Sequence, residues 1–356
     1  MHQQKIRKTV NLKRVMQISM HCERIQSTNK HSMEAIGNNR FGTWNYKAND
    51  VTFHQFLSKG RVWEEHIVEM ARCVIRPGSC VIDVGAHIGT HSIPYSEKAK
   101  AVYAFEMQPE IFALLQKNVR QNNKTNVFTQ NCAVGHREGI AHINDTVYDF
   151  GINGRFDTPL AYKTLAPINY GGVAIGKGTA EAKMITLDSL NFENVSYMKV
   201  DAEGFEPMIF WGAKETIRNN RPVILFEKNL KLVTPEMIED LQIPKEVYEF
   251  DIESFCKEEL GYAGVFKVSN SMDFVAVPKF DTTNLKKLTE KRVQGSIIYE
   301  EKGKFFIQMN GRPKFEVIQF SQDVYGVFFC DVSEFWCFTI EHASISWSNE
   351  TKWVFQ

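Results

Sequence analysis

The sequence predicts an α/β protein with a mostly parallel sheet, and three observations support this class. Short apolar runs occur at Val81–Ile82, Ala101–Phe105 and Val127–Val134. The first run leads into a glycine turn, and an apolar stripe at helical spacing separates the second run from the third. This alternation is typical of strands that are buried on both faces and connected by helices. We therefore expect helices on both faces of the sheet.

The stretch Cys80–Thr90, which reads CVIDVGAHIGT, organises the rest of the chain. A strand, a glycine loop and a helix N-terminus together form a common site for nucleotide-like cofactors. The spacing here is D-x-G-x-x-x-G, whereas dinucleotide binding requires G-x-G-x-x-G. A wider turn with fewer glycines suits a cofactor without a pyrophosphate, and S-adenosylmethionine is our expectation. The same spacing disfavours a nicotinamide oxidoreductase.

The second apolar run predicts a ribose-binding carboxylate. It ends in Glu106, roughly 20 residues after the glycine turn, where such folds place this acid. The glycines would let the cofactor approach the backbone closely. Asp83 would act on the cofactor through the turn and through the methionine amino group. Asn131 and Ala133 are expected near the adenine. The residues expected to contact the cofactor are Asp83, Gly85, Gly89, Glu106, Asn131 and Ala133.

Composition limits the possible partners. Of 356 residues, 43% are hydrophobic and 24% are charged, as in globular proteins. Lysine and arginine together number 42, as do aspartate and glutamate, so there is no overall positive field to hold nucleic acid. No run of about 20 apolar residues occurs, and none therefore predicts a membrane span.

The seven cysteines predict free thiols. They form no C-x-x-C pair, and Cys73, Cys80 and Cys132 lie in apolar runs, as buried thiols do. Free thiols are typical of a reducing compartment, so we expect a cytoplasmic protein.

Changes in pattern divide the chain into three parts. Residues 1–60 are polar and are expected to cap the cofactor cleft, while residues 61–280 carry the alternating strands and helices. Residues 281–356 alternate aromatic and β-branched residues, which predicts a small β-rich accessory domain. Within the central part, residues 136–182 lose regular spacing, and such a stretch is often functional. We expect it to bind the acceptor through residues that include Asn169, Tyr170 and Gly171.

Three acids follow two further apolar strands. Asp201 and Glu203 follow Tyr197–Val200, and Glu227 follows Val223–Phe226. Ligands of open α/β sheets bind at the carboxyl ends of strands, so we expect these acids to be catalytic. Mutual repulsion would raise one pKa, which suits a general base. The acids could instead hold a divalent cation. A structural role, in which an acid only caps a helix or pairs with a lysine, is expected for at least one of the three and most of all for Glu203.

Four sequence blocks carry a family resemblance. They read VWE…RPG, VIDVGAHIGT, LDSL…MKVDAEGFE and RPVILFE, and with the closing SMDFVAVP they cover residues 62–278. In this order they resemble the FkbM family of S-adenosylmethionine-dependent O-methyltransferases. The resemblance implies a Rossmann-like, doubly wound, mostly parallel seven-stranded sheet that serves methylation of a sugar or glycan hydroxyl. It also implies a cofactor contact from Glu64.

One position in the glycine turn departs from the family pattern. His87 stands where the family has Asn, so it either holds the methionine carboxylate differently or faces the acceptor. His87 and His91 are spaced as in a zinc helix, but Ile88 replaces the glutamate of H-E-x-x-H, and we assign no metal to this pair. The alternatives to a glycan methyltransferase are a non-catalytic glycan- or protein-binding module with the same fold and a methyltransferase for a different small molecule or for nucleic acid.

Overall fold

The computed structural model describes most of the chain from residue 34 onward. The described residues are 34–147, 158–159, 168–228, 233, 235–268, 271–281, 286, 292–293, 296–309, 314–329, 334–341, 344–347 and 352–354.

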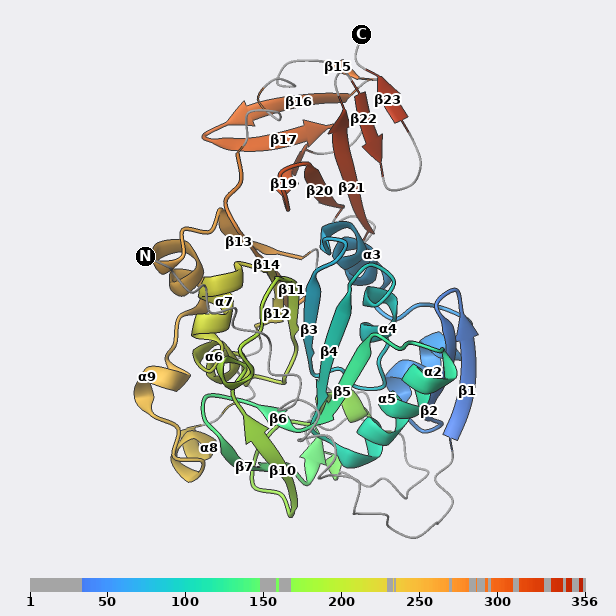
Figure 1. The fold of residues 1–356 in the computed structure, drawn as a ribbon, viewed down its shortest axis with the longest axis vertical. Coiled ribbons are helices and arrows are strands. Elements are labelled where there is room, and N and C mark those ends of the chain that lie inside the picture. The colour runs from blue at the N-terminus through green and yellow to red at the C-terminus, as the bar shows by residue number, and fades with distance from the viewer. Residues whose placement is uncertain are drawn as a thin grey trace, which may run out of the picture.

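The central sheet consists of seven strands, which are β3 (Cys80–Val84), β4 (Ala101–Glu106), β5 (Val127–Asn131), β11 (Val195–Val200), β12 (Val223–Glu227), β13 (Gly264–Lys267) and β14 (Asp273–Val277). Their order in the sheet is β13-β14-β12-β11-β3-β4-β5 (Figure 1). The strands from β12 to β5 are parallel, whereas β14 is antiparallel to both of its neighbours. The predicted α/β class and mostly parallel seven-stranded sheet are confirmed.

The strand order changes direction at β3. From β3 the chain adds β4 and then β5 on one side, and it later adds β11 and β12 on the other. Ligands of open α/β sheets bind at such a point, beyond the carboxyl ends of the strands. The glycine turn after β3 and the acids after β11 therefore lie at the same edge of the sheet.

The helices match the predicted spacing in part. As expected, an apolar stripe is buried in the helix between β4 and β5, and the helix before β3 buries one too. The helix expected after the glycine turn is only one short turn, and two helices separated by Gly212 and Ala213 follow β11. The helices are α2 (Val51–Leu57), α3 (Glu65–Val74), α4 (Ser92–Tyr95), α5 (Pro109–Gln121), α6 (Glu206–Trp211), α7 (Lys214–Asn220), α8 (Pro235–Asp240), α9 (Lys245–Tyr248) and α10 (Ile252–Ser254).

A β-hairpin that precedes the central sheet in the sequence packs against α5, and α2 packs against the hairpin. The hairpin pairs β1 (Glu34–Asn39) with β2 (Gly42–Lys47). The backbone N–H of Asn45 donates to Asn118 Oδ1 of α5 at 2.7 Å, and Asn118 Nδ2 donates back to the Asn45 carbonyl at 3.0 Å. Both asparagines are buried. Because these amides satisfy one another, the hairpin is held on α5 by specific contacts as well as by apolar packing.

A second, three-stranded sheet corrects two expectations. The expected strand Val127–Val134 is divided, because only its first part joins the central sheet as β5. Its end, β6 (Ala133–Val134), pairs instead with β10 (Ala180–Ile185), which also pairs with β7 (Gly139–Ile143). Residues 136–182 are thus more regular than predicted. The short strands β8 (Thr146–Val147) and β9 (Thr158–Pro159) also pair within this stretch.

The C-terminal part is rich in β-strands, as predicted. Two sheets contain β15 (Arg292–Val293), β16 (Ser296–Glu301), β17 (Lys304–Gln308), β18 (Lys314–Glu316), β19 (Ile318–Gln319), β20 (Val324–Phe329), β21 (Glu334–Glu341), β22 (Ser344–Trp347) and β23 (Lys352–Val354). Their apolar residues form a small core of their own. They lie against α3 and away from β6, β7 and β10 (Figure 1).

A disulfide contradicts the expectation that the cysteines are free. Cys73 of α3 is bonded to Cys337 of β21, although 264 residues separate them in the chain. The error arose because a pairing over this distance leaves no local spacing signal. Among the described residues, Cys80 and Cys256 are free thiols. A disulfide is more typical of an oxidising compartment than of the cytoplasm that we expected.

In the part of the chain that the structure describes, no helix has both the length and the apolar character needed to span a bilayer.

Asp50 is expected to make stability depend on pH. Its side chain is 1% exposed and caps α2 by accepting hydrogen bonds from the backbone N–H groups of Thr52 and Phe53. Burial raises its pKa from 3.8 to about 7. The pKa of Asp50 is higher in the folded state than in the unfolded state, so the protonated carboxyl group favours folding. This stabilisation is complete below about pH 4 and is lost as the pH rises through 7.

Asp50→Asn removes this dependence, because asparagine caps a helix equally well and cannot ionise. Between pH 5 and pH 8, we expect the free energy of unfolding to fall by on the order of 1–3 kcal/mol more in the wild type than in the variant. Urea unfolding at the two pH values measures this difference. Parallel pH profiles for the two proteins would contradict the assignment.

Candidate active site

A cavity of about 550 Å³ lies at the carboxyl ends of the parallel strands. It is bounded by the turn after β3, the ends of β4, β11 and β12, and residues from α2 and β6. Most of the predicted site residues line it. These are Glu64, Gly85, His87, Glu106, Ala133, Asn169, Gly171, Asp201, Glu203 and Glu227.

The turn after β3 is fixed from two sides. The backbone N–H groups of Gly85 and Ala86 donate to the carbonyl of Phe105 at 3.0 and 2.9 Å, and Asp201 N–H donates to the Val84 carbonyl. Gly85 has a φ of +75°, and a Cβ at this position would lie 1.9 Å from the backbone oxygen of Asp201. Only glycine allows this close approach. The glycine turn and the acidic segment are therefore in direct backbone contact.

Glu106 occupies the end of β4, as predicted. Its Oε2 accepts a hydrogen bond from the His87 backbone N–H at 3.0 Å, and its Oε1 accepts one from Gln108 N–H at 2.8 Å. The side chain is buried, which raises its pKa to about 7, and the two N–H donors oppose this shift. The carboxylate is thus held in a fixed position on the cavity wall.

Four of the predicted site residues do not line the cavity. Asp83 is buried behind the turn and accepts a hydrogen bond from Ser92 Oγ at 2.5 Å. Asn131 donates to the carbonyls of Glu106 and Met107, and Gly89 packs near Leu115. Tyr170 is buried, with its hydroxyl 3.1 Å from Asn49 Nδ2. For these four, a direct contact with a ligand stays a prediction.

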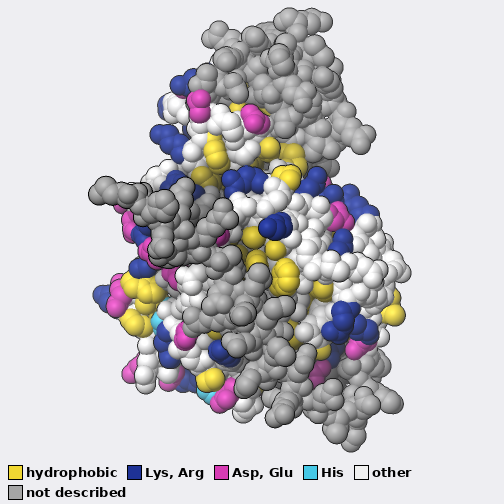
Figure 2. Space-filling view, in the orientation of Figure 1, with side chains coloured by type: hydrophobic (Ala, Val, Ile, Leu, Met, Phe, Trp, Pro, Cys, Tyr) yellow, Lys and Arg dark blue, Asp and Glu magenta, His cyan; other side chains and the backbone are white. Residues whose placement is uncertain are grey.

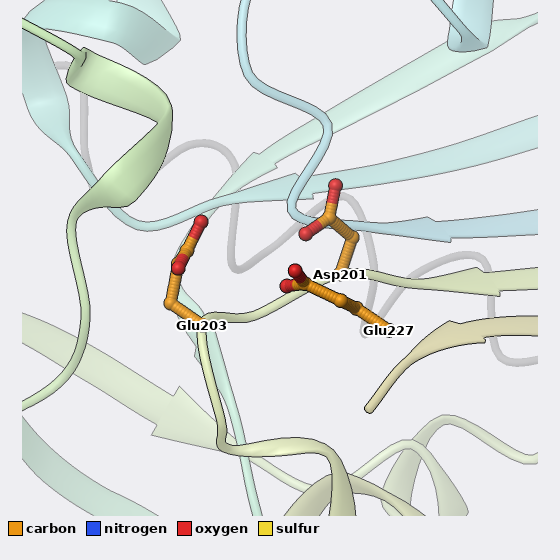
Figure 3. Close-up of side chains that lie close together, drawn as sticks. All are labelled: Asp201, Glu203 and Glu227. Carbon is orange, nitrogen blue, oxygen red and sulfur yellow. The ribbon is translucent and has the colours of Figure 1, made fainter. Parts of the chain in front are cut away.

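Three carboxylates gather on one side of the cavity. Asp201 follows β11, Glu203 lies in the next turn with a φ of +52°, and Glu227 is the last residue of β12. One oxygen from each lies within 4.8 Å of the others, and the three groups face a common space (Figure 3). The predicted juxtaposition of these acids is confirmed.

Burial and mutual repulsion change how these acids ionise. Burial, followed by the charges of Asp201 and Glu206, raises the pKa of Glu227 to about 9. Burial, followed by the charge of Glu227, raises the pKa of Glu203 well above its usual range. The pKa values of Glu203 and Glu227 are thus raised mainly by burial, and the expected repulsion between the acids comes second. The acid that pairs with a lysine is Asp201 rather than Glu203, since Lys199 Nζ lies 2.8 Å from Asp201 Oδ2.

Lys199 is a site residue that the sequence analysis missed. It lines the cavity and is 2% exposed. Burial alone would lower its pKa, but the carboxylates of Asp201 and Asp83 raise it above its ordinary value. The available signal was its position two residues before Asp201, since alternate residues of a strand lie on one face.

Glu64, His91 and Asp273 complete the acidic wall near Lys199. Glu64 has a φ of +45°, and its Oε2 lies 3.4 Å from His91 Nε2. Burial, followed by the charges of Asp273 and Asp201, raises the pKa of Glu64 to about 8. His91 and Asp273 were not predicted as site residues. The position of Asp273 depends on the fold, because antiparallel pairing of β14 with β12 brings it beside Glu227.

His87 forms an aromatic wall together with α2. Its ring stacks on Phe53 with centroids 4.5 Å apart and an interplanar angle of 11°. Burial lowers its pKa to about 3, so the ring is neutral at physiological pH. Neither ring nitrogen has a hydrogen-bond partner among the described residues. The side chain can therefore donate and accept hydrogen bonds to a bound ligand.

These features define the class of protein. A glycine turn at the point where strand order reverses, an acid at the end of the next strand and carboxylates across the cavity are typical of an α/β enzyme that binds a nucleoside-containing ligand. A family model described as "Methyltransferase FkbM domain" matches residues 83–262, which is half of the chain. The chain belongs to this family.

Solved structures that resemble the chain show low identity. The FkbM methyltransferase of Methylobacillus flagellatus KT is 14% identical over 59% of this chain and 50% of its own length, with a TM-score of 0.34. Trm5b from Pyrococcus abyssi is 12% identical over 70% of this chain and 56% of its own length, with a TM-score of 0.33. TYW2 from M. jannaschii, solved with AdoMet, is 16% identical over 36% of this chain and 70% of its own length, with a TM-score of 0.23.

The chain thus aligns with half the length of the M. flagellatus protein. A search of curated proteins finds no match.

Proposed function

We propose that the protein is an S-adenosylmethionine-dependent O-methyltransferase that acts on a hydroxyl of a sugar or glycan. The observation that carries the proposal is the single cavity, which joins the Gly85 turn and Glu106 to the carboxylates of Asp201, Glu203 and Glu227. One end offers the groups that hold an adenosyl cofactor, and the other offers groups that accept a proton. The fold we assign is the Rossmann-like, doubly wound sheet typical of such enzymes.

The residues present fit this cofactor. Gly85 lines the cavity in a turn that no side chain obstructs, and Glu106 presents a buried carboxylate to the same cavity. Gly85 would allow close backbone approach, Glu106 would bind the ribose hydroxyls, and Ala133 would contact the adenine. His87 and Glu64 line the same cavity and would contact the methionine end. When bound, the cofactor supplies a methyl group on a sulfonium, whose sulfur leaves as a neutral thioether.

The acids prepare the acceptor oxygen. Asp201 is the residue we assign as general base, because its carboxylate is held by Lys199 and lies at the cavity end of β11. It takes the proton as the hydroxyl oxygen forms its bond to carbon. Glu203 and Glu227, which line the same cavity, would position the other hydroxyls of the acceptor. Positioning the acceptor in this way contributes as much as the proton transfer does.

The charge of the cavity favours a neutral polyol as acceptor. Its wall contains Glu64, Asp201, Glu203, Glu227 and Asp273 near one lysine, and these acids repel phosphate groups. On the face shown in Figure 2, acidic and basic side chains are interspersed among the described residues. Both observations support a sugar acceptor over nucleic acid. The retained carboxylates support an enzyme over a non-catalytic binding module.

We also propose that the chain has three functional parts. Residues 1–60 form a cap, residues 61–280 form the methyltransferase domain, and residues 281–356 form a β-rich accessory domain. Phe53, which belongs to residues 1–60, lines the cavity, and this position supports a role for the cap in covering the cofactor.

Calorimetry tests the cofactor, and acceptor screening tests the reaction. We expect S-adenosylmethionine and S-adenosylhomocysteine to bind and NAD to show no binding. Neutral sugars and short glycans are then screened for transfer of a radiolabelled methyl group, with nucleotide sugars as the phosphate-bearing comparison. Binding of NAD alone would overturn the proposal, and cofactor binding without transfer to any hydroxyl compound would favour the binding module.

Glu106→Ala is expected to weaken binding of S-adenosylmethionine by about 1–3 kcal/mol, the scale of a lost charge-assisted hydrogen bond. Calorimetry measures the change. Glu97→Ala, a change of the same kind outside the cavity, is the control and should leave the affinity unaltered. Equal affinities for the Glu106 variant and the wild type would refute the ribose assignment.

A further inference from the structure

We propose that Asp201, Glu203 and Glu227 bind a hard divalent cation, of the class of Mg²⁺, Mn²⁺ and Ca²⁺, on the acceptor side of the cavity. The three side chains come from the segment after β11 and from the end of β12, so the cation would join two adjacent strands. The inference deepens the proposed function and rests on it only for the role of the cation, since binding itself can be measured separately.

The spacing of the carboxylates fits a shared cation. One oxygen from each residue lies within 4.8 Å of the other two. Two oxygens on one Ca²⁺, at 2.3–2.6 Å each, can lie up to about 5 Å apart, and Mg²⁺ or Mn²⁺ needs a slightly closer approach. The ligands are all carboxylate oxygens, which hard cations prefer over nitrogen or sulfur. Figure 3 shows the three groups around one space.

Unpartnered carboxylate oxygens provide a second observation. Glu203 Oε2 is inaccessible to solvent and has no hydrogen-bond partner among the described residues. Glu206, which is 1% exposed, follows in the same segment, and its Oε2 also lacks a partner while Oε1 accepts from Ala202 N–H. A buried carboxylate oxygen without a partner is costly, because water is lost and nothing replaces it. A cation at Glu203 removes this cost.

The backbone favours the same assignment. Glu203 has a φ of +52°, a conformation that costs a non-glycine residue free energy. Gly204 follows it and is also in the left-handed region, with a φ of +91°. This turn places the carboxylate of Glu203 beside those of Asp201, which follows β11, and Glu227, which ends β12 (Figure 3).

The cation would select acceptors with neighbouring hydroxyls. Three protein oxygens leave other coordination positions open, and two adjacent sugar hydroxyls can occupy them. When bound, the cation would make a coordinated hydroxyl more acidic, and the carboxylate of Asp201 would take the proton that this hydroxyl loses. The inference therefore adds vicinal diols as the acceptor class for the proposed reaction.

Manganese binding tests the site without any enzyme assay. The full chain is treated with EDTA, dialysed, and titrated with Mn²⁺ while the electron paramagnetic resonance signal of the free ion is recorded. We expect one saturable site, with competition by Mg²⁺ or Ca²⁺. Glu203→Gln and Glu227→Gln should each weaken Mn²⁺ binding at least tenfold. Glu64→Gln, which alters a carboxylate in the same cavity outside this cluster, should bind Mn²⁺ as the wild type does.

The outcomes separate this inference from the proposed function. Absence of saturable Mn²⁺ binding, or equal affinities for Glu203→Gln and the wild type, overturns the cation site. An equal loss in Glu64→Gln also overturns it, because the ion would then lie elsewhere in the cavity. Calorimetry with S-adenosylmethionine on the same metal-free protein tests the cofactor alone. Cofactor binding without Mn²⁺ binding refutes only the cation, and the reverse refutes only the proposed function.

Discussion

Asp201→Asn is expected to lower the rate of methyl transfer by about 10²- to 10⁴-fold while the affinity for S-adenosylmethionine stays nearly constant. Asparagine has almost the same shape as aspartate, but it cannot take a proton from the acceptor hydroxyl. Its neutral amide also leaves Lys199, whose Nζ lies 2.8 Å from Asp201 Oδ2, without its closest carboxylate. The rate is measured with a radiolabelled methyl group and the affinity by calorimetry.

A matched substitution shows whether this loss is local. Asp323→Asn makes the same chemical change at an exposed position of the C-terminal part and should keep the wild-type rate. An Asp201→Asn protein that loses its affinity for S-adenosylmethionine would place Asp201 among the cofactor contacts. A rate equal to that of the wild type would exclude it as the general base.

Gly85→Ala is expected to weaken cofactor binding at least 100-fold, or about 3 kcal/mol. The new Cβ would lie 1.9 Å from the backbone oxygen of Asp201, and a backbone atom cannot rotate away as a side chain can. Either the glycine turn or the end of β11 must therefore move. Alanine at a φ of +75° adds a cost of roughly 1–2 kcal/mol. Calorimetry and urea unfolding measure the two effects.

Gly78 provides a matched control for this variant. It has a φ of +80°, but a Cβ there would meet nothing within 4 Å. Gly78→Ala should therefore show the backbone cost in stability and keep its affinity for the cofactor. If the two variants bind S-adenosylmethionine equally well, the close contact between the turn and Asp201 does not support the cofactor site.

The sheet could be predicted because each strand carries its own signal. Val81–Ile82 and Ala101–Phe105 are apolar and are followed by polar residues, so both the strand and its carboxyl end can be located. The positions of Glu106 and Asp201 at one edge then follow from the parallel arrangement. The same argument brought Glu227 to this edge, which the structure confirms.

Other features depend on pairings between distant segments. Lys199 belongs to an otherwise apolar strand, and its spacing of two residues from Asp201 was the one local signal of the ion pair that the fold forms. Asp273 reaches the cavity because β14 pairs antiparallel with β12. The left-handed backbone of Glu64 and Glu203 could not be read from residue type, since glutamate rarely adopts it. The electrostatics of the cavity are therefore a property of tertiary structure.

The bond between Cys73 and Cys337 makes much of the polypeptide a covalent ring. All strands of the central sheet lie between the two cysteines in the sequence, so peptide cleavage at one exposed loop within this ring leaves both pieces joined. They would separate on a gel only after reduction. The ring also limits how far the unfolded chain can expand, which by chain entropy favours the folded state by about 5 kcal/mol. The C-terminal strands thus stay attached to α3 even when their non-covalent contacts open.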